Sequence, residues 1–93
     1  MRERDVEAYL RDQIKQLGGI AYKFTSPGNA GVPDRLVLLP GGRVVFVELK
    51  APGKKSTPIQ LRQQRRIQDL GFQVLVIDSK AGVDEFIKGV RCG

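Results

Sequence analysis

Hydrophobic residues near the start of the chain recur at helical spacing. Val6, Leu10, Ile14 and Leu17 fall on one stripe of a helix, because successive members are three or four positions apart. This stripe predicts a helix over residues 3–17, and the two glycines that follow end it.

Three apolar runs come next, and they predict strands over residues 20–24, 34–39 and 43–50. A loop rich in glycine and proline separates the first run from the second. Only Pro40-Gly41-Gly42 separates the second from the third, so these two strands are expected to form a β-hairpin.

The length of the hairpin loop decides which side chains meet. A two-residue turn would place Asp34 and Glu48 on opposite faces of the sheet. A three-residue loop instead pairs Leu39 with Arg43 and sets Asp34 directly across from Glu48. We expect the three-residue loop, because Gly42 can adopt the left-handed conformation that such loops need.

A second helix begins with a recognisable N-terminal signature. Thr57 suits the N-cap, Pro58 the first helical position, and Gln60 the position at which a capping box places a glutamine. A glycine then ends the helix. Its predicted apolar stripe consists of Ile59, Ile67 and Leu70.

The last third of the chain predicts one more strand and one more helix. Residues 72–78 are almost continuously apolar, which favours a central strand covered on both faces. Ser79 can cap the helix that follows. The expected order is α-β-β-β-α-β-α in a single domain over residues 1–93. The fold class is therefore α/β, with a mixed β-sheet flanked by helices.

Composition points to an intracellular protein with a polyanionic partner. The chain carries a net charge of +6 and a pI near 9.9, and nucleic acid is the commonest partner of such proteins. No apolar run approaches the roughly 20 residues of a membrane span, and no secretory signal is expected. The lone Cys92 excludes an intrachain disulfide, and the absence of histidine excludes the usual zinc sites.

Two acids and a lysine are the residues that suggest chemistry. Glu48 and Lys50 are two positions apart on a strand and so share a face, which by itself is usually a structural ion pair. Asp34 changes this interpretation, because two converging carboxylates repel each other unless a cation lies between them. Such oxygen ligands suit Mg²⁺ or Mn²⁺, and a lysine beside the metal can activate water or stabilise charge on a phosphate.

Three short motifs together resemble a known family of nucleases. Gly31-Val32-Pro33-Asp34, then Glu48-Leu49-Lys50, then Gln60 occur in an order similar to that of the PD-(D/E)xK nuclease superfamily. Within it, the chain most resembles the VRR-NUC (virus-type replication-repair nuclease) group. The resemblance covers nearly the whole chain and implies a restriction-endonuclease-like core.

The resemblance implies a role for each residue of these motifs. Asp34 and Glu48 would bind Mg²⁺ or Mn²⁺, with the backbone carbonyl of Leu49 as a further ligand. Lys50 would be the catalytic lysine. Gln60 would reach into the site from the second helix, although its capping-box role alone would also explain it.

Further residues have both a functional and a structural interpretation. Glu7 matches an acid that such nucleases often carry in the first helix, where it could bind metal, but it also suits a solvated first helical turn. The basic and loop residues around the motifs could contact DNA phosphates, or could form an ordinary solvated surface. This second set comprises Lys54, Lys55, Arg62, Arg65, Arg66, Ser26 and Asn29.

The sequence therefore predicts a metal-dependent DNA endonuclease without an organic cofactor. The resemblance further suggests a phage or bacterial homodimer, acting in the cytoplasm on branched DNA such as four-way junctions. One alternative is a non-catalytic DNA-binding or assembly module on the same fold. A weaker alternative is a nuclease that processes RNA.

Overall fold

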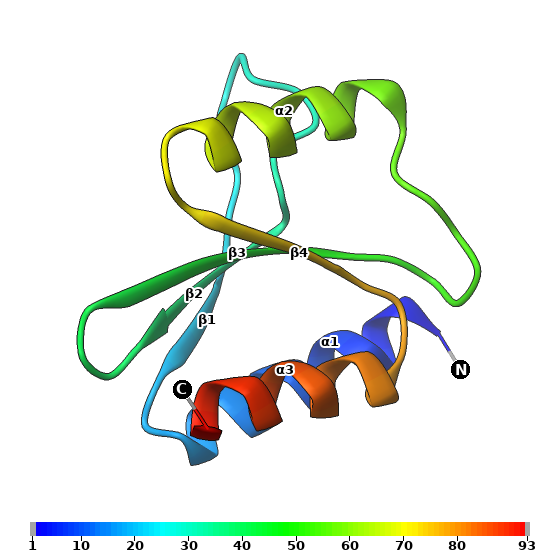
Figure 1. The fold of residues 1–93 in the computed structure, drawn as a ribbon. Helices are drawn as coiled ribbons and strands as arrows, with labels where there is room; N and C mark the ends of the chain where they lie inside the picture. The colour runs from blue at the N-terminus through cyan, green and yellow to red at the C-terminus, as the bar shows by residue number, and fades with distance from the viewer. Residues whose placement is uncertain (1, 93) are drawn as a thin grey trace.

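The computed structural model describes residues 2–92, and its elements follow the expected order (Figure 1). They are α1 (Glu3–Gln16), β1 (Ile20–Lys23), β2 (Arg35–Leu39), β3 (Arg43–Leu49), α2 (Pro58–Asp69), β4 (Gln73–Ile77) and α3 (Lys80–Cys92). No helix in this part of the chain combines the length and the hydrophobicity needed to cross a membrane.

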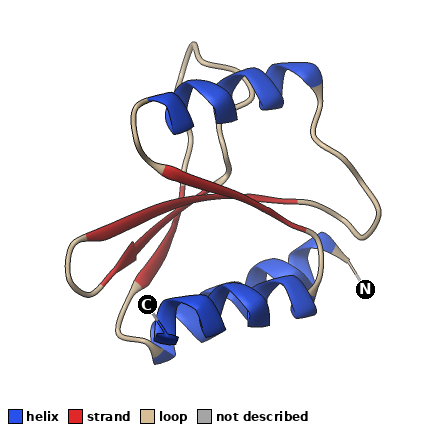
Figure 2. Cartoon of the chain, viewed as in Figure 1, coloured by secondary structure: helices blue, strands red, loops and turns tan. Residues whose placement is uncertain are grey.

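The four strands form one mixed sheet in the order β1-β2-β3-β4 (Figure 2). The pairs β1–β2 and β2–β3 are antiparallel, whereas β3–β4 is parallel, as a crossover through α2 requires. Helices α1 and α3 lie side by side on one face of the sheet, and α2 lies on the other (Figure 1). The predicted α/β class and the mixed sheet are confirmed.

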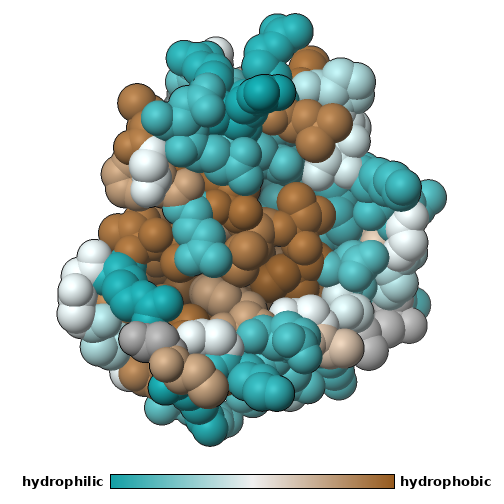
Figure 3. Space-filling model, in the orientation of Figure 1, coloured by the Kyte–Doolittle hydropathy of each residue, from teal (hydrophilic) through white to brown (hydrophobic). Residues whose placement is uncertain are grey.

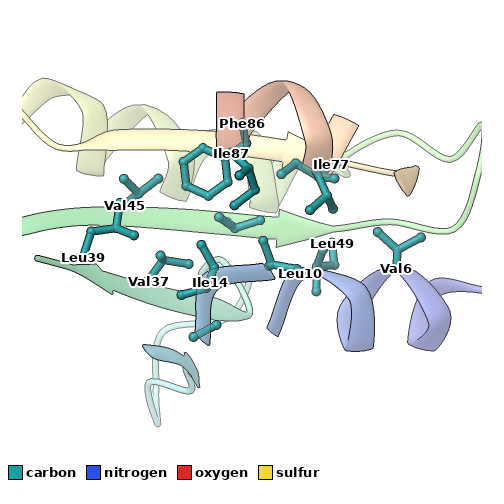
Figure 4. Close-up of a cluster of buried hydrophobic side chains, with 13 residues drawn as sticks. Val6, Leu10, Ile14, Val37, Leu39, Val45, Leu49, Ile77, Phe86 and Ile87 are labelled. Atoms are coloured by element: carbon teal, nitrogen blue, oxygen red, sulfur yellow. The ribbon is translucent and has the colours of Figure 1, made fainter. Parts of the chain in front are cut away.

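The hydrophobic core lies between the sheet and the α1–α3 pair (Figure 4). Val6, Leu10 and Ile14 of α1 have no exposed surface, as the helical stripe predicts. Alternate residues of β2 and β3 meet them from the sheet, because side chains two apart on a strand share a face. This one-sided core fixes which strand residues are left to face α2.

The hairpin loop has the predicted length. Leu39 pairs with Arg43, which leaves Pro40-Gly41-Gly42 as a three-residue loop. Gly42 has a φ of 79°, in the left-handed region that the prediction required, and Gly41 has a φ of 86°. Extending the register by one residue beyond β2 sets Asp34 across from Glu48.

Two expectations about packing are wrong. Strand β4 is an edge strand rather than a central one, and Val76 is 48% exposed. A continuous apolar run does not distinguish the two positions, because the sheet order decides whether a strand has a neighbour on each side. The predicted stripe of α2 is also largely exposed, with Ile59 at 52% and Leu70 at 77%. This helix contacts little of the sheet besides β4, and Gln64, at 7% exposed, is its one buried residue.

Candidate active site

The loop before β2 holds Asp34 in a fixed position. Gly31 has a φ of 87°, and a Cβ atom there would lie 2.5 Å from Cγ2 of Ile59, so the loop packs closely against the start of α2. Pro33 is fully buried, and the carbonyl of Asp34 accepts a hydrogen bond from the Phe24 N–H. The Asp34 carboxylate in turn accepts a hydrogen bond of 3.0 Å from the Leu49 N–H.

Glu48 and Lys50 lie on the face of β3 that is turned toward α2. Glu48 is 4% exposed, and its Oε2 lies 3.5 Å from the Lys50 Nζ. The backbone of Lys50 is held by a bond from its N–H to the Ile77 carbonyl on β4. Because both side chains are largely buried, bulk water solvates neither charge fully. Each charge therefore depends on its protein neighbours for stabilisation.

Gln60 connects α2 to this pair. Its Oε1 accepts hydrogen bonds from the Lys50 ammonium and from the Thr57 N–H, and its Nε2 donates to Glu48 Oε2 at 3.3 Å. The Gln60 N–H donates to the Thr57 hydroxyl, which completes the capping box. The two interpretations of Gln60 therefore hold together: one side chain caps the helix and also contacts both charged residues.

Nearby positive charge neutralises Asp34 and Glu48 only in part. The pKa of Glu48 is raised from 4.5 to about 7, chiefly by burial and next by the Asp34 carboxylate, against the opposing effect of Lys50. Burial also raises the pKa of Asp34, although the hydrogen bond from the Leu49 N–H opposes this. A cation between these carboxylates would lower both pKa values, so the site has the electrostatics of a cation site.

The carboxylates of Asp34 and Glu48 fit Mg²⁺ or Mn²⁺. They do not fit a metal that is bound only by protein side chains. Within residues 2–92 no cluster of three or more histidine, cysteine, aspartate or glutamate side chains could enclose an ion. Asp34 and Glu48 would thus leave open positions for a backbone carbonyl, water or substrate. Mg²⁺ suits this arrangement, because it usually binds through one or two carboxylates and keeps several waters.

Glu7 makes an ion pair on the α1 side of the sheet. Its carboxylate lies 2.7 Å from the guanidinium of Arg35, a residue that is only 6% exposed. Arg35 also donates to the Ala21 carbonyl at 3.0 Å. The Glu7 charge is close enough to raise the pKa of Asp34. The structure therefore gives Glu7 a definite partner, and its role as a metal ligand stays a prediction.

Comparison with known proteins assigns the family. No family model matches the chain. A phage protein named "Putative nuclease p44", from Acyrthosiphon pisum secondary endosymbiont phage 1, is 56% identical over 80 residues, which are 86% of each chain. A solved structure described as a "VRR_NUC domain" has a TM-score of 0.87 at 38% identity, over 92% of this chain and 94% of that one. The chain belongs to the VRR-NUC family.

This VRR-NUC chain places its predicted DNA-contacting residues in three groups. Lys54 and Lys55 are exposed on the loop before α2, and this loop is fixed by a bond from the Gly53 N–H to Asp78. Ser26 and Asn29 line a crevice of about 240 Å³ together with Arg66 of α2. The remaining two, Arg62 and Arg65, line a separate hollow on α2.

The sequence interpretation missed Arg35 as a residue that supports the site. A signal was present, because Arg35 follows Asp34 directly and occupies an inward-facing position of an otherwise apolar strand. An arginine at such a position requires a buried acceptor, and Glu7 and the Ala21 carbonyl supply it. Its Nε has no hydrogen-bond partner in the described residues.

Proposed function

We propose that this VRR-NUC chain is a metal-dependent endonuclease that hydrolyses phosphodiester bonds in DNA. One observation carries the proposal: Glu48, Lys50 and Gln60 contact one another, and the Asp34 carboxylate accepts a hydrogen bond from the Leu49 N–H, which lies between Glu48 and Lys50 in the chain. A structural ion pair would account for Glu48 and Lys50, but it would not account for a second, half-buried carboxylate close to them.

Each residue has a role that its contacts support. Asp34 and Glu48 would hold Mg²⁺ or Mn²⁺, with the Leu49 carbonyl as a further ligand, and the bound ion would act as a Lewis acid toward the phosphate. Lys50 is oriented by Glu48 and Gln60, so its ammonium can donate to an attacking water or to the charge that develops on a phosphate oxygen.

The remaining parts of the proposal concern the substrate. A net charge of +6 favours a polyanion, and the basic residues on α2 and its preceding loop flank the site. Residues 2–92 hold one such site, so paired cuts in two strands of a branched DNA need two chains. We therefore propose a homodimer that acts on branched DNA, such as a four-way junction, in the cytoplasm of a bacterium or of a phage-infected cell.

Cleavage by metal-loaded protein tests the enzymatic role. We expect Mn²⁺ or Mg²⁺ to support cleavage of a four-way junction, and EDTA to abolish it. Lys50→Met should lower the rate by about 10²-fold or more, because it removes a charged donor from the site. Lys15→Met is the control, since it deletes an exposed lysine of α1 and should cut at the wild-type rate.

The result also separates the alternatives. Intact junction, duplex and single-stranded DNA in the presence of Mn²⁺ would refute the nuclease and favour a non-catalytic DNA-binding module. Faster cleavage of matched RNA substrates would instead identify an RNA-processing nuclease. Wild-type rates in Lys50→Met would show that the site lies elsewhere.

A further inference from the structure

A crevice lies between α2 and the loop that joins β1 to β2. This loop lies beside α2 (Figure 1), and its residue Gly31 packs against Ile59 at the start of the helix. Farther along the helix, the crevice between the two elements has a volume of about 240 Å³. Hydrophobic surface is exposed around the C-terminal end of α2 (Figure 3), and Leu70, which lines the crevice, is 77% exposed. The helix therefore leaves this part of the sheet open to a ligand.

Aromatic rings line the crevice from the sheet. Phe24 follows β1 directly, and Phe46 lies on β3. Their ring centroids are 5.8 Å apart at an interplanar angle of 67°, so the two rings are not stacked on each other. Phe72 makes an edge contact with Phe46 at the same centroid distance, which restrains the Phe46 ring. Aromatic rings held in this way are a surface on which an unstacked nucleobase packs.

Two side-chain amides line the same crevice, and each is oriented through its amino group. The Nδ2 atom of Asn29 donates to the Ser26 hydroxyl at 2.8 Å. The Nε2 atom of Gln63 donates to the Ala30 carbonyl at 3.2 Å. These bonds leave the two amide oxygens as acceptors, and the amino and ring N–H groups of a base are matching donors. In duplex DNA the opposite base occupies those donors, so the amides favour a base that is unpaired.

The crevice adjoins the active site. Phe46 and Glu48 are two positions apart on β3, so they share a face of the sheet and lie about 7 Å apart along the strand. The Phe24 N–H donates to the Asp34 carbonyl at 2.8 Å, which connects the crevice to the second acid as well. The spacing along β3 is about twice that of stacked nucleotides in a DNA strand. It therefore suits a strand in which the nucleotide next to the bound phosphate is unstacked.

We propose that this crevice binds one unpaired nucleobase of the DNA, next to the phosphate that is cut. The base packs against Phe24 and Phe46, and its pairing edge donates to the amide oxygens of Asn29 and Gln63. Arg66 is exposed where it borders the crevice and binds a neighbouring phosphate. This inference rests on the proposed function and deepens it by naming the feature of the substrate that is recognised. Unpairing a base costs least where a duplex is interrupted, so the crevice favours a branch over a continuous duplex.

Binding in EDTA, which prevents cleavage, tests the crevice by itself. The probe is a DNA duplex with one unpaired adenine, and the reference is the same duplex with an abasic nucleotide at that position. We expect wild-type protein to bind the adenine probe about tenfold more tightly, because stacking on an aromatic ring contributes about that factor. Phe46→Leu removes the ring and Gln63→Leu removes the amide, and each should reduce the ratio to about threefold or less. Gln68→Leu is the matched control, because Gln68 is exposed on the same helix outside the crevice and should keep the full ratio.

The outcomes separate the crevice from the nuclease. Equal affinity of wild-type protein for the two probes would overturn the proposal, as would a full ratio in Gln63→Leu and in folded Phe46→Leu. With Mn²⁺, the cut should fall at a phosphate directly beside the unpaired adenine, and a cut two or more nucleotides away would overturn the placement of the base. Preference for the adenine probe without any cleavage would refute the nuclease and support the base-binding crevice. Cleavage without that preference would refute the crevice alone.

Discussion

At the scale of single residues, the site combines burial with incomplete neutralisation. Asp34 and Glu48 are held where water does not screen them fully, and Lys50 offsets only part of their charge. Gln60 then fixes the ammonium and one carboxylate through two different atoms of its amide. The repulsion between the two carboxylates is unfavourable in metal-free protein, and a bound cation would reduce this repulsion. The resulting loss in the free energy of unfolding can be measured.

Glu48→Gln should stabilise the metal-free protein at high pH. The pKa of Glu48 is about 7 in the fold against 4.5 ordinarily, so the folded protein holds this proton more tightly than the unfolded chain does. The ionised form consequently destabilises the fold, and the penalty develops as the pH rises from 4.5 to about 7. Its upper bound is about 3 kcal/mol.

Urea unfolding in EDTA measures this effect. Glu48→Gln should be more stable than wild type by about 1–3 kcal/mol near pH 8, with little difference near pH 4. Addition of Mg²⁺ should stabilise wild type but not the variant. An equal difference at both pH values would show that Glu48 ionises normally in the fold.

Glu7→Gln separates a structural from a metal-binding role. The change leaves the buried Arg35 guanidinium without its anion, so the free energy of unfolding should fall by about 1–3 kcal/mol. Mn²⁺ affinity, measured by calorimetry on the folded variant, should stay within about threefold of wild type if Glu7 only pairs with Arg35. A loss of affinity of tenfold or more, without a loss of stability, would make Glu7 a metal ligand.

At the scale of elements, the loop before β2 positions the first acid. Its path depends on Gly31, which has a positive φ and lies against the backbone of Ile59. Ile59 therefore packs against this loop and does not form part of a buried stripe beneath α2. The helix in turn places Gln60 one residue later, so a single contact aligns the residues that two elements bring to the site.

Gly31→Ala should destabilise the protein more than Gly28→Ala. Both glycines have positive φ, 87° and 82°, so both substitutions introduce backbone strain of about 1 kcal/mol. Only at Gly31 does the added methyl group also meet Ile59, whereas at Gly28 it meets open space. Thermal unfolding should show an extra loss of about 1–3 kcal/mol at Gly31. Equal losses at both sites would show that the loop does not pack on α2 in solution.

At the scale of the whole molecule, charge is distributed unevenly between the two faces of the sheet. The face that carries α2 also carries the acids of the site and the exposed arginines of that helix, with the basic loop before it. Helix α2 and residues 51–57 of the loop before it carry five basic residues and one acid, whereas α1 and α3 together carry six basic and six acidic residues. DNA approaching the site from the α2 side would therefore meet the basic residues first.

Arg66→Gln should weaken DNA binding and its dependence on salt. Arg66 lies with Ser26 and Asn29 at one crevice, so one phosphate contact should be lost. In EDTA, which prevents cleavage, the slope of log K against log salt should fall in magnitude by about 1. Arg11→Gln removes the same charge from α1, on the opposite face, and should leave the slope unchanged. Equal effects of both variants would indicate a general charge effect and no contact at Arg66.

The sequence by itself determined the order of the elements, the hairpin loop and the convergence of Asp34 with Glu48 and Lys50. Periodicity, capping residues and loop length are local properties, so a few neighbouring residues encode them. Only the tertiary structure decided that β4 is an edge, that Glu7 pairs with Arg35 and that Gln60 both caps α2 and contacts the site. These features depend on contacts between residues distant in the chain, and several partners satisfy the same local pattern equally well until the fold selects one.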